Sequence, residues 1–157
     1  LLDGSVTTDK VVTLKVQPVS YRQEALDPRW VPSVWPIPRS AGFVTAEFET
    51  TRGVLKNQHL GIDIAAPAGT TIHATADGKV VFSDVHMDLG NMVAIDHYGA
   101  YVTRYGHNSL LLVSVGENIR KGQPIALVGN SGLSSGPHLH YEVLDGGKSR
   151  NPRQYLP

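Results

Sequence analysis

The sequence predicts an all-β fold: a curled antiparallel sheet, or barrel-like β-sandwich, with an open groove, preceded by an extended proline-rich segment. Short runs rich in β-branched and aromatic residues recur from Gly42 to the end of the chain. Turn pairs such as Asp77-Gly78 and Lys121-Gly122 separate these runs. No window beyond Gly42 has a helical period. Short strands at such spacing are typical of a sandwich or a barrel-like antiparallel sheet.

The N-terminal part of the chain differs from the rest in composition. Residues 12–16 alternate between apolar and polar, which predicts a half-buried strand, and residues 21–26 could form one or two helical turns. The stretch 27–38 is dense in proline, which excludes helix and favours an extended chain. Both tryptophans lie there, and we interpret them as rings that pin a linker to a neighbouring surface rather than as a substrate-binding patch. We therefore divide the chain into an extension, 1–38, and a domain, 39–157.

The strands of the domain follow from its apolar runs. Each run is short, alternating or β-branched, and bounded by glycine, asparagine or aspartate. The predicted strands cover residues 44–48, 70–72, 79–82, 92–95, 101–105, 110–115, 124–128 and 140–144, and the run Ile62-Asp63-Ile64 is β-like as well.

Composition excludes several classes of function. Among 157 residues the net charge is zero, so no basic field attracts nucleic acid. There is no cysteine, so a zinc site would have to use histidine and carboxylate ligands. No stretch approaches the roughly 20 apolar residues of a membrane helix. The chain starts at Leu1 without a signal segment, and we interpret it as a mature form or a fragment whose targeting sequence or anchor lies upstream.

Two histidines stand one residue apart after a glycine-rich turn. His138 and His140 begin a strand-like run directly after the turn 129–136. Side chains alternate along a strand, so both imidazoles point the same way. Such a pair can bind a metal, or one imidazole can bind it while the other acts as acid or base. From spacing alone, two surface histidines fit equally well.

A second pair of candidate ligands lies earlier in the chain. His59 and Asp63 are four residues apart, and on a strand this spacing returns to the same face. With His140 they give two histidines and one carboxylate, the arrangement of a catalytic zinc that keeps a fourth position open. A surface hydrogen-bonded pair of His59 and Asp63 would account for the spacing as well. His107, after the predicted strand 101–105, is either a strand-end histidine that reaches the same cleft or an exposed turn histidine.

The order of the motifs resembles a known family. The sequence is similar to the lysostaphin/LytM-type zinc metallopeptidases, which cut peptidoglycan cross-links, over about residues 36–157. The motifs that carry the resemblance are His59-Leu60-Gly61-Ile62-Asp63, Gly69-Thr70, Asp77-Gly78, Gly90-Asn91, Ile95-Asp96-His97, Tyr105-Gly106-His107, Gly122-Gln123, Gly129-Asn130-Ser131-Gly132 and Gly136-Pro137-His138-Leu139-His140-Tyr141-Glu142.

The resemblance implies a role for each of these residues. It makes His59, Asp63 and His140 the ligands of one Zn²⁺ per chain, and His107 and His138 the catalytic histidines. The resemblance does not divide the roles of the two; our hypothesis assigns the general base to His138, and the stabilisation of the oxyanion to His107, alone or together with His138. The family fold, a curled antiparallel sheet with an open groove, agrees with the strands predicted above.

Some positions depart from the family pattern or fall outside its site. The usual Tyr-Ala-His-Leu reads Tyr105-Gly106-His107-Asn108, and the usual Ser-Thr-Gly-Pro reads Ser134-Ser135-Gly136-Pro137. The common Phe-Gly-x-Arg reads Phe48-Glu49-Thr50-Thr51-Arg52. These departures affect groove shape and substrate preference rather than the chemistry. We expect His73, His86 and His97 to be structural or solvated. Glu142 could support a metal-binding histidine, but we expect it to be an exposed strand carboxylate.

The resulting hypothesis is a zinc endopeptidase that hydrolyses peptide cross-links of bacterial peptidoglycan. The alternative is a catalytically silent module that binds peptidoglycan or activates amidases, since some relatives in this family have that role; a structural envelope protein with a vestigial site ranks last. All three imply an extracytoplasmic location (periplasm, cell envelope or secreted). The expected partners are peptidoglycan stem peptides and a regulatory protein or upstream segment, and no nucleic acid. A glycine bridge, a D-Ala–diaminopimelate cross-link and a stem-peptide bond are all compatible with the sequence.

Overall fold

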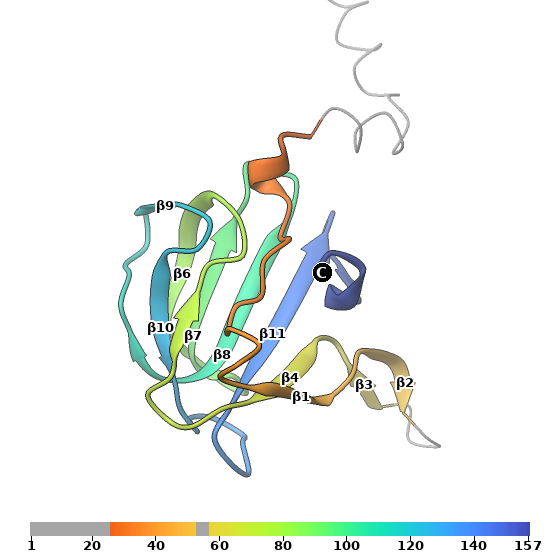
Figure 1. Ribbon diagram of the computed structural model, residues 1–157, viewed down its shortest axis with the longest axis vertical. Coiled ribbons are helices and arrows are strands. Elements are labelled where there is room, and N and C mark those ends of the chain that lie inside the picture. The colour runs from red at the N-terminus through yellow and green to blue at the C-terminus, as the bar shows by residue number, and fades with distance from the viewer. Residues whose placement is uncertain (1–25, 53–56) are drawn as a thin grey trace, which may run out of the picture.

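A computed structural model describes residues 26–52 and 57–157 (Figure 1). The predicted strand over 12–16 and nearly all of the predicted turns over 21–26 lie outside this range. The described part contains twelve strands and two short 3-10 helices, and no α-helix. The elements are η1 (Pro28–Trp30), β1 (Phe43–Ala46), β2 (Glu49–Arg52), β3 (Asn57–His59), β4 (Ile62–Ala65), β5 (Thr71–His73), β6 (Gly78–His86), β7 (Gly90–Asp96), β8 (Val102–Leu111), β9 (Asn118–Ile119), β10 (Pro124–Val128), β11 (His138–Asp145), β12 (Lys148–Arg150) and η2 (Pro152–Gln154).

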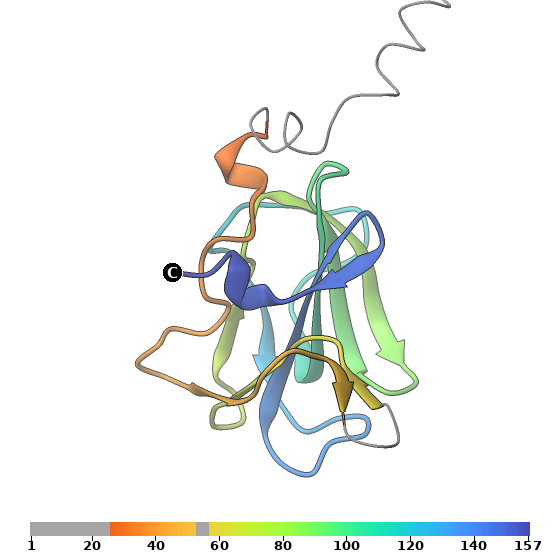
Figure 2. The same cartoon turned by 90° about the vertical axis from the view of Figure 1, so that its right-hand side faces the viewer.

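The strands form one large antiparallel sheet and one small hairpin sheet. The main path runs β1-β4-β11-β8-β7-β6-β9, with β10 pairing β5 and β8, and β12 pairing β11. The second sheet is β2-β3. Figures 1 and 2 show that the large sheet curls but does not close, and that β1 and β4 cross one end of it. The predicted all-β fold, an open curled antiparallel sheet, is confirmed.

The hydrophobic core lies on the inner side of the curled sheet. It is built from alternating positions of the long strands, such as Val93, Ile95, Leu139 and Val143, which are all fully buried. The alternation follows from the two-residue period of a strand, which sends every second side chain to the same face. Burying these faces supplies most of the free energy that favours folding.

The proline-rich segment lies across this core. Ile37 is 1% exposed and belongs to the core cluster. The indole Nε1–H of Trp35 donates to the carbonyl of Pro157 at 3.2 Å, and the ring of Trp30 lies 5.1 Å from that of Tyr98. The tryptophans therefore pin the segment to neighbouring surfaces, as predicted. The division of the chain at residue 38 stays a prediction.

One stretch of the domain differs from the predicted strands. Residues 101–105 and 110–115 were predicted as separate strands, but β8 runs without a break from Val102 to Leu111, and residues 112–115 form no strand. The polar sequence His107-Asn108-Ser109 was interpreted as the end of a strand. In the structure an irregular register lets the strand continue through it. The prediction of two strands there was wrong, whereas the bounds of β10 are those predicted.

The central pair of strands, β8 and β11, presents two chemically different faces. Tyr141 pairs with Tyr105, and both side chains are fully buried on the core side. The neighbouring pairs, Glu142 with Arg104 and His140 with Gly106, point to the other side. This alternation places His140 and Glu142 together outside the core.

Candidate metal centre

Asp63 on β4 lies directly beside His140 on β11. The two are paired residues in the β4–β11 ladder. Gly61 allows β4 to approach, because a Cβ atom there would lie 2.2 Å from the carbonyl oxygen of Tyr141. A larger residue at position 61 would push β4 away from β11, and with it Asp63 away from His140.

Three potential ligand atoms converge at this point. The Nδ1 atom of His140 lies 2.9 Å from Oδ1 of Asp63, and the Nε2 atom of His59 lies 3.2 Å from the same oxygen. One ligand atom from each of the three residues falls within a span of 4.8 Å. The structure therefore brings together the three residues that the resemblance predicts as ligands.

Each of the two histidines has its other nitrogen fixed. The Nδ1 atom of His59 lies 2.8 Å from the carbonyl oxygen of Glu47. A carbonyl only accepts, so Nδ1 carries the proton and Nε2 is turned towards Asp63. For His140 the arrangement is reversed: Nε2–H donates to Oε2 of Glu142 at 2.8 Å, which leaves Nδ1 on the side of Asp63. Partners of this kind set the tautomer and ring orientation of a metal-binding histidine.

Glu142 was expected to be an exposed carboxylate, and that prediction was wrong. It is 5% exposed, and its Oε1 atom accepts from Nη1 of Arg104 at 3.0 Å. The alternative expectation, that Glu142 supports a histidine, describes the observed arrangement, because the two-residue spacing puts both side chains on one strand face. The charge of Glu142 is thus balanced by an arginine and an imidazole.

His138 and His107 lie next to the three converging residues. The Nε2 atom of His138 is 3.8 Å from Oδ1 of Asp63. Its Nδ1–H donates to the carbonyl of Gly136 at 2.8 Å, so in the neutral ring Nε2 is unprotonated. The ring of His107 lies 4.8 Å from that of His138 and 6.1 Å from that of His140. All five predicted site residues therefore gather in one place.

His107 reaches the site from the middle of β8 rather than from a strand end. Its backbone has a φ of 65°, a conformation that costs a non-glycine residue roughly 1–2 kcal/mol. The register of β7 against β8 shifts between Asn91 and Val93, which is the irregularity of a β-bulge. The bulge turns His107, which regular alternation would direct away from Gly106 and His140, towards the site.

Two loops hold His107 in this conformation. Its backbone N–H donates to the carbonyl of Leu89 at 2.6 Å, and its Nδ1–H donates to the carbonyl of Ser131 at 2.7 Å. The hydroxyl of Ser131 accepts from the backbone of Asn91 at 3.0 Å, so the two loops are also tied to each other. Sequence reasoning did not assign these roles to Leu89 and Ser131; the glycine-rich motif around Ser131 was the available signal.

The electrostatics of the site differ from residue to residue. Burial opposes protonation of His140, but its hydrogen bonds to Asp63 and Glu142 outweigh burial and raise its pKa to about 9. The hydrogen bond to Asp63 also raises the pKa of His59. Burial works against the charged form of Asp63, yet the bonds from His140 and His59 hold its pKa well below the usual range. Burial lowers the pKa of His107.

The remaining histidines lie outside this cluster. His97 is fully buried between the carbonyl of Asp77 and the hydroxyl of Thr103, which confirms a structural role. His86 accepts the backbone N–H groups of Asp88 and Leu89 at 3.2 and 3.1 Å and so shapes the β6–β7 turn. His73 has its Nδ1 atom 3.4 Å from the carbonyl of Pro36.

The donor set fits a zinc ion. Two imidazole nitrogens and one carboxylate oxygen are the ligands of many catalytic zinc sites, in which the fourth position stays open. Without a cation, protons bridge His140 and His59 to Asp63; a cation at that point would take the place of these protons. A cleft of about 220 Å³, lined by Asp63, His138, Thr45 and Ser135, opens beside the cluster. A substrate carbonyl can therefore approach the open position.

Comparisons with known proteins identify the family of the chain. The model of Peptidase family M23 matches residues 57–152. The peptidoglycan DD-endopeptidase ShyA of Vibrio cholerae is 45% identical over 93 residues, which are 59% of this chain and 22% of ShyA. The murein hydrolase activator NlpD of Escherichia coli is 42% identical over 108 residues, which are 68% of this chain and 28% of NlpD. The chain thus spans only about a quarter of the length of such relatives.

Solved structures show the same fold. A zinc-containing peptidase from Vibrio cholerae superposes with a TM-score of 0.72 at 35% identity, covering 78% of this chain and 40% of that chain. The catalytic domain of the antimicrobial peptidase lysostaphin from Staphylococcus simulans gives a TM-score of 0.67 at 25% identity, covering 73% of this chain and 91% of that domain. By its sequence match, its open antiparallel sheet and its His-Asp-His cluster, the chain belongs to Peptidase family M23.

Proposed function

We propose that the protein is a zinc-dependent endopeptidase that hydrolyses peptide cross-links of bacterial peptidoglycan. The observation that carries the proposal is the convergence of His59, Asp63 and His140 within 4.8 Å, with two further imidazoles beside them. Relatives named as peptidoglycan DD-endopeptidases support the substrate class. The proposed activity implies an extracytoplasmic location.

The three converging residues would hold one zinc ion per chain. A zinc ion bound there would polarise the scissile carbonyl and supply a water molecule with a pKa near 7. The hydrogen bonds from His59 to Glu47 and from His140 to Glu142 would keep the coordinating nitrogens oriented.

His138 is the proposed general base. Its Nδ1–H is committed to the carbonyl of Gly136, so Nε2 is free to accept a proton from the attacking water. That nitrogen also faces Asp63 across 3.8 Å, at the edge of the cleft where the water would lie. A general base needs to be within hydrogen-bond reach of its proton, directly or through one water.

His107 is the proposed partner that stabilises the oxyanion. To donate a hydrogen bond, its Nε2 must carry a proton, whereas burial lowers the pKa of His107 and favours the neutral ring. The donating form would therefore arise during the reaction, when Nε2 of His138 passes the proton it has taken from the attacking water to Nε2 of His107; the centres of the two rings lie 4.8 Å apart. A donor aimed at a developing oxyanion is typically worth about 10²–10³ in kcat.

The test combines zinc content with cleavage of purified peptidoglycan sacculi. The wild-type protein should bind one zinc per chain and release soluble muropeptides. His59→Ala should lose both zinc and cleavage, and His138→Ala should keep zinc and lose cleavage. His73→Ala is the matched control, since His73 lies outside the cluster, and it should retain both. Normal turnover in His138→Ala would contradict the role of His138, and absence of zinc from the wild type would contradict the metal site.

The second candidate is a module that activates a cell-wall amidase. It is favoured by the 42% identity to a protein named as a murein hydrolase activator. This function predicts zinc-independent stimulation of a partner amidase, and no muropeptide release by the purified protein alone. In either case, no helix of the described residues is long and apolar enough to cross a membrane.

A further inference from the structure

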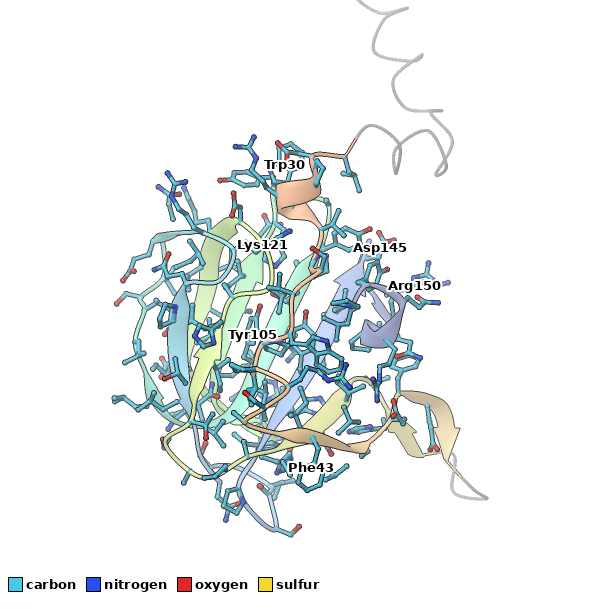
Figure 3. The ribbon with its side chains drawn as sticks, in the orientation of Figure 1. Trp30, Phe43, Tyr105, Lys121, Asp145 and Arg150 are labelled. Atoms are coloured by element: carbon cyan, nitrogen blue, oxygen red, sulfur yellow. The ribbon has the colours of Figure 1, made fainter. Side chains whose placement is uncertain are left out.

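A largely apolar pocket lies beside the cleft at the candidate metal centre. It has a volume of about 510 Å³, and its walls include Phe43, Ala66, Pro67 and Pro137. The side chain of Phe43, at the start of β1, is 70% exposed and lies in the lower part of the molecule in Figure 3. An exposed aromatic ring beside an apolar hollow is a common feature of binding surfaces.

The pocket is continuous with the cleft. Ala65 and Pro137 line both. Ala65 pairs with Phe43 on one side and with His138 on the other, so the three strands β1, β4 and β11 carry the pocket towards the site. A peptide whose scissile carbonyl lies at Asp63 and His138 can therefore extend into the pocket.

Arg39 is the single cationic residue among those that line this pocket. The turn that carries it is closed by a hydrogen bond from the N–H of Ala41 to the carbonyl of Pro38, at 2.8 Å. The guanidinium carbon lies 4.5 Å from the centre of the Trp35 ring. Stacking on an aromatic ring orients a guanidinium and leaves its N–H groups available for an anion.

Arg153 provides an internal comparison. Its guanidinium carbon lies 5.3 Å from the centre of the same ring, but it is already paired with both carboxylate oxygens of Glu47, at 3.2 and 2.9 Å. No ion pair joins Arg39 to a carboxylate among the residues that the structure describes. Arg153 does not line the pocket, whereas Arg39 does. Of the two arginines at Trp35, Arg39 is thus the one positioned to receive an anionic group from a ligand.

We infer that this pocket is a substrate subsite that takes a small, carboxylate-bearing residue of the cross-linked peptide, with Arg39 as the partner of the carboxylate. The inference rests on the proposed function for the position of the scissile bond. Apolar walls of alanine, proline and phenylalanine suit methyl and methylene groups, and the guanidinium fork matches the two oxygens of a carboxylate. The carboxylate belongs either to a side chain or to the free C-terminus of the peptide.

The experiment compares soluble cross-linked muropeptides that differ only in one group. The first muropeptide has a free side-chain carboxylate and a free C-terminal carboxylate. In the second the side-chain carboxylate is replaced by an amide, and in the third the C-terminal carboxylate is replaced by an amide. For the wild type, the amide at the recognised position should raise KM about tenfold and change kcat little, as expected for one charge-assisted contact. Which of the two amides has this effect identifies the source of the carboxylate.

Two variants with the same change of charge show whether Arg39 is responsible for the preference for the carboxylate form. Arg39→Met should bind all three muropeptides as weakly as the wild type binds the unfavoured amide. Arg153→Met should keep the wild-type preference. Added salt should reduce the preference of the wild type, because the contact is exposed. Equal KM values of the wild type for all three muropeptides, or an unchanged preference in Arg39→Met, would overturn the inference.

A binding measurement separates this inference from the proposed function. Dissociation constants of the three muropeptides are measured by calorimetric titration of the zinc-loaded His138→Ala variant, which lacks the proposed general base and does not turn the ligand over; they stand for the affinities of the wild type. If the wild type binds the carboxylate form about tenfold more tightly but cleaves none of the three, the subsite stands and the endopeptidase proposal fails. If it cleaves all three but binds them equally, the endopeptidase proposal stands and the subsite fails.

Discussion

Buried histidines lie against both faces of the β8–β11 pair, and their pKa values are shifted in opposite directions. On the site face, His140 is 8% exposed, and its bonds to Asp63 and Glu142 outweigh burial and raise its pKa to about 9. On the core face, His97 is fully buried, and burial lowers its pKa to about 4. Both imidazoles are largely withdrawn from water, so depth alone does not decide their protonation.

The core face holds a chain of neutral groups. His97 donates from Nδ1 to the carbonyl of Asp77, so its Nε2 accepts from the hydroxyl of Thr103, at 2.7 Å. The hydroxyls of Thr103 and Tyr105 lie 2.8 Å apart, and that of Tyr105 lies 3.1 Å from Thr75. Each hydroxyl can donate in the same direction, towards His97. A second proton on His97 would reverse this chain, which adds to the cost of burying a charge.

The site face has charges where the core face has dipoles. Asp63 and Glu142 supply two carboxylates to one imidazole, and Arg104 balances Glu142. In the metal-free protein a proton on His140 balances part of this negative charge. A divalent cation can replace that proton at Nδ1 without disturbing the core. The difference between the faces is therefore the difference between a site that exchanges a cation and a scaffold that holds its shape.

The largest expected effect comes from removing the buried carboxylate of the site face. Glu142→Leu should lower the free energy of unfolding by about 3–5 kcal/mol, because Arg104 and His140 are left without their partner. It should also weaken zinc binding by about 10–100-fold, because the ring of His140 is no longer held. Urea unfolding and a competitive zinc titration would measure the two effects.

Glu47→Leu is the matched control, because Glu47 also pairs with an arginine. The side chains of Glu47 and Arg153 are 56% and 38% exposed, so losing the pair should cost less than about 1 kcal/mol. The contact to His59 should survive, since it uses the main-chain carbonyl of Glu47. Glu142→Gln, which keeps an acceptor without the charge, should fall between wild type and Glu142→Leu. If Glu47→Leu and Glu142→Leu lowered the free energy of unfolding equally, the exposed and the buried carboxylate would contribute equally to stability, and the contrast would be wrong.

The next effect is a pH dependence that arises on the core face. The pKa of His97 falls from 6.5 to about 4 on folding, so between these values the unfolded chain binds a proton that the folded chain does not. The contribution of His97 to the free energy of unfolding is therefore fully present above about pH 6.5. It is lost as the pH falls towards 4, and the total loss is about 3 kcal/mol. His140 and His59, whose pKa values are raised, are protonated in both states well below pH 6.5 and add no slope there.

Urea unfolding of the metal-free protein at several pH values between 7.5 and 4.5 would measure this slope. In His97→Gln, which keeps an amide donor and acceptor but cannot be charged, most of the slope should disappear. A slope that is unchanged in His97→Gln would show that other groups, such as His107, control acid stability.

The fold class could be predicted from the sequence for a physical reason, whereas the set of five candidate site residues came from the resemblance to the family. Strand alternation sends every second side chain to the same face, so the positions of His138 and His140 follow from local periodicity. The short apolar runs between glycine-containing turns likewise reported most of the long strands, including β7, β10 and β11. Both signals are contained within a few neighbouring residues.

What the sequence did not reveal depends on contacts between distant segments. His107 looked like a strand-end residue, because nothing nearby in the chain indicates that Leu89 and Ser131 hold it at a φ of 65°. Glu142 looked exposed, because its burial depends on Arg104, 38 positions away. The missed strands β2, β3, β9 and β12 are short and largely polar, so their pairing partners rather than their composition define them.

The smallest expected effect tests whether the two faces act independently. Thr103→Val replaces the hydroxyl between His97 and Tyr105 with a methyl group of similar size. Nε2 of His97 is then buried without a donor, while the hydroxyl of Tyr105 keeps Thr75, so the free energy of unfolding should fall by about 1–2 kcal/mol. Zinc affinity should stay within about twofold of wild type, because no group of the site face is touched and distant sites are usually additive. A weakening of zinc binding as large as that of Glu142→Leu would mean that β8 transmits strain from the core to the bulge at His107, and that the two faces form one unit.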